Sequence, residues 1–412
     1  MRTLALALLL PLAASAQVTA IRAGTLVDPE TGSAAKGRVV LVEGGRIKSI
    51  GDTVPAGAQL IDLPRATLLP GLMDAHTHLC FTGHFSGVHG IEELLRSVVA
   101  DTVLDTTGHR ALIGANNARE MLEAGFTTVR DVGNAGNYAD TDLRRAIEEG
   151  LVPGPTMLNA GRIIGPLGGQ SRGLNPERPD LGEPEYLYAD SRDEMQKAVR
   201  KNILFGARLI KIALDDQPYL YTPEEVHYIV EQAALAGVKV AAHCATAKGA
   251  QIAAEGGVAS VEHGYRASLE TLQLMAKKHI VLVGTDFTAD ADRAMGTSFH
   301  PLVVERLKRA LRAGTTMAFG SDIVFAKPGW TRGTLSMDTI ETFIEAGVLP
   351  RVLLQAMTGN AARLLGVEKE RGFLEPGLWA DLVATDGNPL DDPRALKRVV
   401  FVMKAGRVVR GP

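Results

Sequence analysis

Between about residues 68 and 364, short apolar runs alternate with helical patterns, and this rhythm constrains the fold more than any other feature. The runs are Leu68–His78, Phe126–Val132, Thr156–Ile164, Ala207–Leu214, Val238–His243, Val258–His263, Ile280–Thr285 and Thr315–Ser321. Eight strands that alternate with helices predict a parallel (β/α)8 barrel of the TIM type. An open, doubly wound sheet is the alternative, but no G-x-G-x-x-G follows any of the runs.

Helix start signals lie between the predicted strands. Ser191 with Glu194, and Thr222 with Glu225, have the spacing of capping boxes, and Pro223 stands where a first helical residue is expected. We therefore predict that helices begin at these two points.

The two ends of the chain have a different pattern from the middle. Residues 17–66 and 365–412 contain short strand-like runs broken by turn signals such as Asp28-Pro29 and Pro376-Gly377. Each end alone has too few strands to bury a face, so we expect both to pair into one small β-sandwich. The predicted domains are a β-sandwich from residues 17–66 and 365–412, and a barrel from residues 67–364.

The first 16 residues predict a secretory signal peptide. One arginine precedes an apolar run from Leu4 to Leu12, and Ala14-Ser15-Ala16 fits a cleavage site before Gln17. A buried N-terminal strand or helix is the alternative. No other stretch approaches the ~18 uninterrupted apolar residues of a membrane helix. We expect an exported protein, periplasmic or secreted, whose mature form is not in a membrane.

The composition bounds the partners. With 46% hydrophobic and 22% charged residues, the chain is typical of a soluble globular protein. A net charge of −3 provides no basic face for nucleic acid. We expect a small-molecule substrate and no nucleic-acid partner. Whether the chain forms a homo-oligomer stays an open question.

Polar residues at the ends of the predicted strands indicate where the chemistry occurs. Strands of a parallel barrel are buried on both faces, and catalytic groups lie at their C-terminal ends. Six such groups break the apolar pattern here: His76, His78, Lys211, His243, His263 and Asp322. A single histidine at a strand end is more often structural, but six polar groups at matching ends predict a shared site. Imidazole and carboxylate ligands suit zinc or a similar divalent ion.

Three further residues stand near these groups. Asp74 has the same parity as His76 and His78 but lies deeper in the strand, so we expect it to orient its neighbours rather than to bind metal. Cys80 and Cys244 each lie within two residues of a histidine. They could be ligands, but two thiols do not make a C-x-x-C zinc site, and packing is the favoured interpretation.

These motifs together resemble the amidohydrolase superfamily in its two-metal form. The resemblance begins at Pro70-Gly71-Leu72-Met73-Asp74 with His76-Thr77-His78 and spans nearly the whole chain beyond the signal. It favours the imidazolonepropionase-related and prolidase-like (Xaa-Pro dipeptidase-like) branch. It implies that His76, His78 and Asp322 bind one metal and that His243 and His263 bind the other. It also implies two divalent ions, zinc by expectation, bridged by a carbamate on Lys211.

The resemblance implies a metal-dependent hydrolase. A hydroxide bridging the metals would attack an amide C–N bond in a peptide-like compound, an N-acyl amino acid or a cyclic amide, with Asp322 as catalytic base and then acid. A deaminase of the same superfamily, a lactone or ester hydrolase, and a non-catalytic binding protein are the alternatives. Residues 243–246 are His-Cys-Ala-Thr rather than the His-x-x-Glu of the single-metal deaminases, and no G-x-S-x-G or H-E-x-x-H is present.

Substrate contacts are harder to predict. The prolidase-like branch often has Gly-Gly-His after strand three and a tyrosine two residues after the strand-five histidine. This chain has Gly168-Gly169-Gln170 and Ala245 at those positions, so dipeptidase specificity is in doubt. The candidates near strand ends are Arg162, Gln170, Tyr219, Tyr221, Tyr265 and Arg266, together with His84 in the glycine-rich loop after the first strand.

Overall fold

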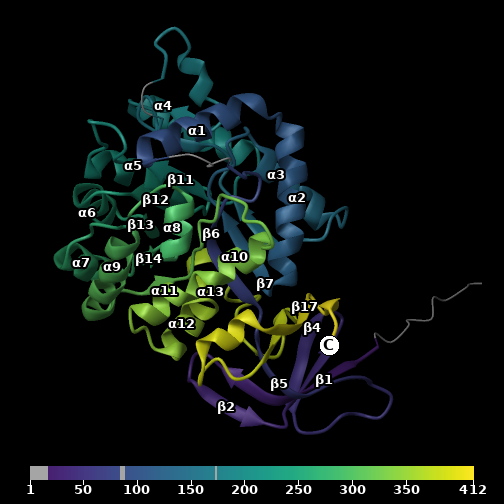
Figure 1. Ribbon diagram of the computed structural model, residues 1–412. Helices are drawn as coiled ribbons and strands as arrows, with labels where there is room; N and C mark the ends of the chain where they lie inside the picture. The colour runs from purple at the N-terminus through teal and green to yellow at the C-terminus, as the bar shows by residue number, and fades with distance from the viewer. Residues whose placement is uncertain (1–16, 84–88, 172–173) are drawn as a thin grey trace, which may run out of the picture.

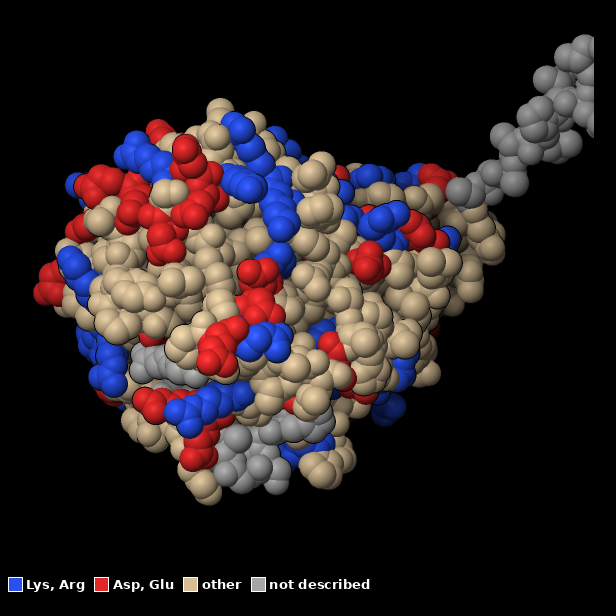
Figure 2. Space-filling model, turned by 90° about the horizontal axis from the view of Figure 1, so that it is seen from above, with Lys and Arg blue, Asp and Glu red and all other residues tan. Residues whose placement is uncertain are grey.

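The computed structural model describes residues 17–83, 89–171 and 174–412. The predicted signal peptide and His84 lie outside the described residues. Figure 1 shows two parts: a barrel surrounded by helices, and a smaller β-sheet domain that contains strands from both ends of the chain. On the face in Figure 2, acidic and basic side chains are interspersed.

The barrel consists of two parallel sheets that close on each other. One has the order β6-β7-β8 and the other β10-β9-β11-β12-β13-β14-β15. The strands are β6 (Leu72–Thr77), β7 (Phe126–Asp131), β8 (Thr156–Asn159), β9 (Ile163–Gly165), β10 (Tyr186–Tyr188), β11 (Ile210–Ala213), β12 (Val240–Cys244), β13 (Ser260–His263), β14 (Val281–Val283) and β15 (Met317–Ala318).

Main-chain hydrogen bonds join the two sheets on both sides. Ala75 N donates to Phe319 O over 2.7 Å, and Asp322 N donates to His76 O over 2.9 Å. On the opposite side, Arg208 N donates to Asn159 O over 2.7 Å. The barrel is thereby closed, and the strand ends that bear the predicted ligands face one mouth.

Helices cover the outside of the barrel (Figure 1). The two predicted capping boxes are confirmed at Ser191 and Thr222, the residues before α4 and α5. The helices are α1 (Ile91–Leu104), α2 (Thr107–Glu123), α3 (Ala139–Glu148), α4 (Arg192–Leu204), α5 (Pro223–Ala234), α6 (Ala247–Gly256), α7 (Leu269–Lys277), α8 (Ala289–Ala294), α9 (His300–Ala313), α10 (Arg332–Asp338), α11 (Ile340–Glu345), α12 (Pro350–Ala356) and α13 (Gly359–Leu365), with short 3₁₀ turns at Pro179–Gly182 and Pro393–Lys397. Within the described part of the chain, none of these helices is long and apolar enough to cross a membrane.

The smaller domain is one folded-over sheet, with the order β18-β17-β16-β5-β1-β3-β4 and β2 beside β1. Its strands are β1 (Thr19–Asp28), β2 (Ser33–Lys36), β3 (Val39–Glu43), β4 (Arg46–Gly51), β5 (Gln59–Pro70), β16 (Leu382–Asp386), β17 (Val399–Lys404) and β18 (Arg407–Arg410). The sheet folds over its own apolar face. Ile47, in edge strand β4, hydrogen-bonds Gly377 and Leu378, which lie in the segment before β16, and these bonds join the two sides of the fold. Side chains from both chain ends, such as Ile21 and Phe401, fill this interior.

Strands β5 and β16 join the two ends of the chain. They pair antiparallel, with Pro70 opposite Leu382 and Ala66 opposite Asp386. The predicted barrel with a β-sandwich built from both termini is therefore confirmed.

The first predicted strand differs from the expectation. Leu68–His78 contains the end of β5 and then β6, which are separated by Gly71. A β-carbon at Gly71 would lie 2.1 Å from Thr127 Oγ1, so the close approach there requires glycine. The apolar run looked continuous in the sequence because it is buried on both sides of this break, first in the sandwich and then in the barrel.

Candidate metal centre

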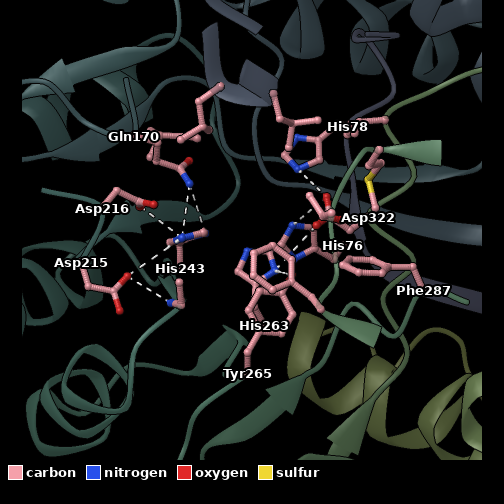
Figure 3. A pocket seen from close by; sticks show the side chains of 18 of the residues that line it. His76, His78, Gln170, Asp215, Asp216, His243, His263, Tyr265, Phe287 and Asp322 are labelled. Carbon is pink, nitrogen blue, oxygen red and sulfur yellow. Dashed lines mark hydrogen bonds and ion pairs between the residues drawn. The ribbon is translucent and has the colours of Figure 1, made fainter. Parts of the chain in front are cut away.

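Three side chains that could bind a metal, two histidines and one aspartate, converge at the mouth of the barrel. His76 and His78 lie at the end of β6, and Asp322 follows β15. The Asp322 Oδ1 atom lies 3.2 Å from His78 Nε2 and 3.6 Å from His76 Nε2. Figure 3 shows the three side chains pointing toward one another. Their donor atoms are close enough to hold one metal ion.

The other ring nitrogen of each histidine has a partner of its own. His76 Nδ1 donates to Glu262 Oε2 over 2.7 Å, and His78 Nδ1 donates to Gly133 O over 2.8 Å. A partner at Nδ1 fixes the tautomer and leaves Nε2 as a lone-pair donor, which is the arrangement that metal-ligating histidines need. The residues therefore fit a divalent metal.

A buried ion pair lies beneath His76. Arg130, in β7, donates to both carboxylate oxygens of Glu262 over 2.8 and 2.9 Å. It also donates to Ala75 O and to Ser260 Oγ, so it links three strands across the barrel. Burial favours a high pKa for Glu262, but Arg130 and His76 hold it well below its usual range. Sequence analysis missed this pair, although Arg130 and Glu262 are charged residues inside two of the apolar runs, which was a signal for it.

Lys211 lies in β11 and is 2% exposed. Burial lowers the pKa of its ammonium, although Glu262 and Asp322 act in the opposite direction. A lowered pKa favours the neutral amine, which is the form that can react with carbon dioxide.

His243 has different neighbours from those expected. Its Nε2 lies 3.1 Å from Asp216 Oδ2 and 4.0 Å from Asp215 Oδ1, and the Gln170 amide nitrogen is 3.3 Å from both ring nitrogens. Asp215 also accepts hydrogen bonds from the backbone nitrogens of Ala245 and Thr246. The group that can hold a metal here is His243, Asp215 and Asp216. Sequence analysis did not select the two aspartates, although consecutive acids after a barrel strand were a visible signal.

His263 lies between the two groups. Its ring centre is 4.4 Å from that of His243 and 5.0 Å from that of His76, and its Nδ1 lies 3.6 Å from Asp322 Oδ2. The same nitrogen is 2.9 Å from Thr285 Oγ1 and 3.4 Å from the Tyr265 hydroxyl. The structure thus brings all six predicted ligands to one site, with His263 central.

Backbone strain is concentrated at this mouth. His263, Thr285 and Asp322 adopt φ angles of 62°, 53° and 54°. Residues other than glycine rarely adopt this left-handed conformation, and such strain clusters at functional sites.

Asp74 contacts backbone rather than a ligand side chain. Its Oδ1 accepts hydrogen bonds from His76 N over 3.0 Å and from Ser321 N over 3.1 Å. Burial raises the pKa of this carboxyl to about 7. The contacts agree with the expected orienting role, because they tie β6 to the segment that bears Asp322. Cys80 and Cys244 are buried free thiols.

A pocket of about 300 Å³ opens above the cluster. Its lining includes all six predicted ligands, with Ile163, Gln170, Asp215, Asp216, Ala245, Thr246, Tyr265 and Thr297, and the apolar side chains of Leu94, Leu95, Phe287, Met295, Phe299 and Val324.

Two of the predicted substrate contacts, Gln170 and Tyr265, line this pocket, and four do not. Arg162 is buried, and its guanidinium donates to Tyr186 O. Tyr219 and Tyr221 donate their hydroxyls to Leu167 O and Ala189 O, and Arg266 is exposed to solvent. The structure does not place these four residues at the pocket, contrary to the expectation. The reason is that proximity to a strand end does not fix the direction of a side chain.

Comparison with known proteins identifies the family. Residues 67–409 match the model of the amidohydrolase family. Ochratoxinase from Aspergillus niger is 28% identical over 444 aligned residues, which cover 96% of this chain and 88% of that protein. An imidazolonepropionase from Kosmotoga olearia is 26% identical and covers 91% of each chain. The crystal structure of a Xaa-Pro dipeptidase with bound methionine superimposes with a TM-score of 0.83 at 28% identity, covering 96% of this chain and all of that one. The protein therefore belongs to the amidohydrolase family, in the branch that includes imidazolonepropionases and Xaa-Pro dipeptidases.

Proposed function

We propose that the protein is a metal-dependent hydrolase that cleaves an amide C–N bond. The observation that supports this most directly is the position of Asp322, whose carboxylate lies within 3.6 Å of the ring nitrogens of His76, His78 and His263. The family and the named relatives, ochratoxinase and the Xaa-Pro dipeptidase, support the same reaction class.

In this proposal, His76, His78 and Asp322 hold one divalent ion, and His243 with His263 holds a second. Lys211, as a carbamate, is the shared ligand, and Asp215 and Asp216 are additional donors at the His243 end. We expect zinc, because imidazole-rich sites suit it. When bound, such ions polarise the substrate carbonyl and lower the pKa of water.

Asp322 moves the proton. Its carboxylate takes a proton from the attacking water and returns it to the leaving nitrogen, which departs as a neutral amine. The neighbouring histidines hold the pKa of Asp322 below its usual value, against the effect of burial, so it begins the reaction ionised and able to act as a base. Tyr265 remains a neutral phenol, because burial raises its pKa, and can donate a hydrogen bond within the pocket.

The test combines metal content with turnover. Protein purified without chelator should contain about two equivalents of zinc or manganese, measured by elemental analysis. Loaded protein should hydrolyse at least one compound in a panel of N-acyl amino acids, dipeptides and cyclic amides, with lactones in parallel. Activity confined to lactones would overturn the amidase proposal, and absence of bound metal would favour a binding protein.

Export by the predicted signal peptide is a separate proposal. Mass spectrometry of the mature N-terminus tests it, with cleavage expected before Gln17.

A further inference from the structure

One buried arginine contacts both chain segments that carry His78 and Asp322. Arg332 is the first residue of α10 and is 5% exposed. Its Nη2 atom donates to Phe81 O and to Thr82 Oγ1, each over 2.9 Å, and its Nη1 atom donates to His78 O over 3.4 Å. The guanidinium therefore holds the segment that leaves β6 after the two histidines.

The same guanidinium also holds the segment that follows β15. Its Nη1 atom donates to Ile323 O, the carbonyl directly after Asp322. Close to this contact, Gly83 N donates to Val324 O over 2.6 Å, so the two segments also pair with each other. Arginine presents its donors in a rigid planar fork, which fixes the distance between the groups that it binds. Arg332 thereby sets the spacing between the two segments.

The position of Arg332 is in turn fixed by α2. Its backbone nitrogen donates to Glu120 Oε2 over 2.7 Å. A β-carbon at Gly333 would lie 2.3 Å from Glu120 O, so the start of α10 packs against α2 at close range. Thr331 caps the same helix end by accepting a hydrogen bond from Thr334 N. The guanidinium therefore reaches the mouth of the barrel from a rigid base.

Loss of the guanidinium would leave the two segments without this link. Phe81 and Ile323 are buried, and buried backbone carbonyls are nearly always paired. Burial lowers the pKa of Arg332 to about 10, so the group is still charged at neutral pH. A lysine at this position would keep the charge, but its single ammonium cannot reproduce the fork.

Arg332 does not line the substrate pocket. Other side chains line the pocket above the metal centre. Arg332 lines a separate groove of about 440 Å³, together with Thr82, Asn117 and Trp330. An effect of Arg332 on the reaction must therefore pass through the ligands that its two segments carry.

We propose that Arg332 is a positioning residue that sets the distance between Asp322 and the pair of His76 and His78, and so shapes the metal site that these three residues form. We call this the first site. The inference rests on the proposed function, in which that site holds a divalent ion.

Zinc titration of the metal-free protein is the first test. The unaltered protein should bind two zinc ions. Arg332→Lys should weaken the binding of one of them by about 10–100-fold, the usual effect of losing a group that orients a ligand. The affinity for the other ion should stay unchanged. On an amide that the zinc-saturated protein cleaves, kcat should fall with little change in KM, because Arg332 lies outside the pocket.

A double variant shows which site is affected. His78→Asn removes a ligand of the first site, so this variant should keep the zinc ion held by His243 and His263. Addition of Arg332→Lys to His78→Asn should leave that remaining affinity unchanged. A further loss in the double variant would show that Arg332 acts on the whole barrel, and it overturns the inference.

Arg144→Lys is the matched control. Arg144 is also 5% exposed, and its guanidinium also binds a backbone carbonyl, Gly206 O, and the side chain of Asn159. It lies in α3 rather than beside the ligands. Thermal unfolding should show lower stability in both lysine variants, whereas zinc affinity should change only in Arg332→Lys.

Thr82→Val is a milder second variant. It removes one acceptor of the fork at nearly the same volume, so it should weaken the first site to a smaller extent than Arg332→Lys. It decides the inference where Arg332→Lys does not fold, and zinc affinities equal to those of the unaltered protein would then overturn it.

The outcomes separate the two proposals. If a folded Arg332→Lys protein binds both zinc ions as tightly as the unaltered protein, the inference is overturned and the proposed function stands. If the unaltered protein binds two zinc ions but cleaves no amide, the proposed function fails and the titrations alone decide the inference. Absence of zinc binding by the unaltered protein overturns both.

Discussion

The histidines at the two ends of the centre are held in different ways. His76 is 1% exposed, and its Nδ1 partner Glu262 is fully buried and paired with Arg130 beneath the site. His243 is 12% exposed, and its neighbours Asp216 and Gln170 themselves line the pocket.

This difference separates two kinds of residue around one centre. At the His76 end, the supporting groups are part of the barrel interior, so they contribute to folding as well as to ligand geometry. At the His243 end, the supporting groups face the substrate space, so they can vary with the substrate while the barrel stays intact. Substitutions should therefore divide into those that change stability and those that change ligand binding.

The largest effect is expected at Asp322. Asp322→Asn keeps the shape but removes the proton acceptor, and kcat should fall by about 10²–10⁴-fold, the usual contribution of a general base or acid. Steady-state kinetics on metal-loaded protein measures this. Asp290→Asn, which alters an exposed pair with Arg293, is the control and should leave kcat unchanged. Near-full activity of Asp322→Asn would remove Asp322 from the reaction.

Glu262→Gln should have the next largest effect. It leaves Arg130 buried without its charge partner, which costs about 3–5 kcal/mol of unfolding free energy. It also weakens the anchor of His76, so metal affinity should fall about 10–100-fold. Urea unfolding and zinc titration measure the two effects. Glu305→Gln, at an exposed pair with Lys308, is the matched control. A loss no greater than in this control would contradict the bracing role of Glu262.

Asp74→Asn should change the pH dependence of stability. Burial raises the pKa of Asp74 to about 7, above the value of about 3.9 in an unfolded chain. The folded state therefore binds the proton more tightly, and the stability of the metal-free protein should fall as pH rises from about 4 to about 7. The variant has no such proton, so its stability relative to the unaltered protein should rise over this interval by on the order of 2–4 kcal/mol.

Urea unfolding at pH 4, 6 and 8 measures this shift. Asp62→Asn is the control, because Asp62 is exposed and its pKa is lowered by Arg22 rather than raised by burial. Parallel pH curves for Asp74→Asn and the unaltered protein would show that the carboxyl does not titrate in this range.

The smallest effect on stability is expected at Asp216. Asp216→Asn removes a charge beside His243 at the edge of the pocket, and the unfolding free energy should change by about 1 kcal/mol or less. Asp216 contributes to the raised pKa of His243, against the effect of burial, so this pKa should fall in the metal-free variant. NMR titration of the His243 ring measures the fall. A stability loss as large as that of Glu262→Gln would erase the distinction between the two ends.

Sequence analysis could predict the barrel and the six polar residues that meet at its mouth, because strand periodicity and polar residues at strand ends are local signals. It could not predict the Arg130–Glu262 pair, which joins strands β7 and β13 across the barrel. It also could not predict that Phe287 and Phe299 line the pocket, because both lie in loops after β14 and their direction depends on long-range packing. For the same reason, Arg162 and Tyr221 turned out to bind backbone carbonyls rather than to face the pocket. Long-range packing decided these cases.

The pairing of β5 with β16 also affects the order of folding. About 310 residues separate Pro70 from Leu382, yet the two stand opposite each other in one sheet. Contacts between such distant segments form slowly because a long loop must close first. During synthesis, strands β1 to β5 leave the ribosome long before β16 exists, and a side of β5 stays without its partner until then. The small domain is therefore the part of the molecule that is completed last during synthesis.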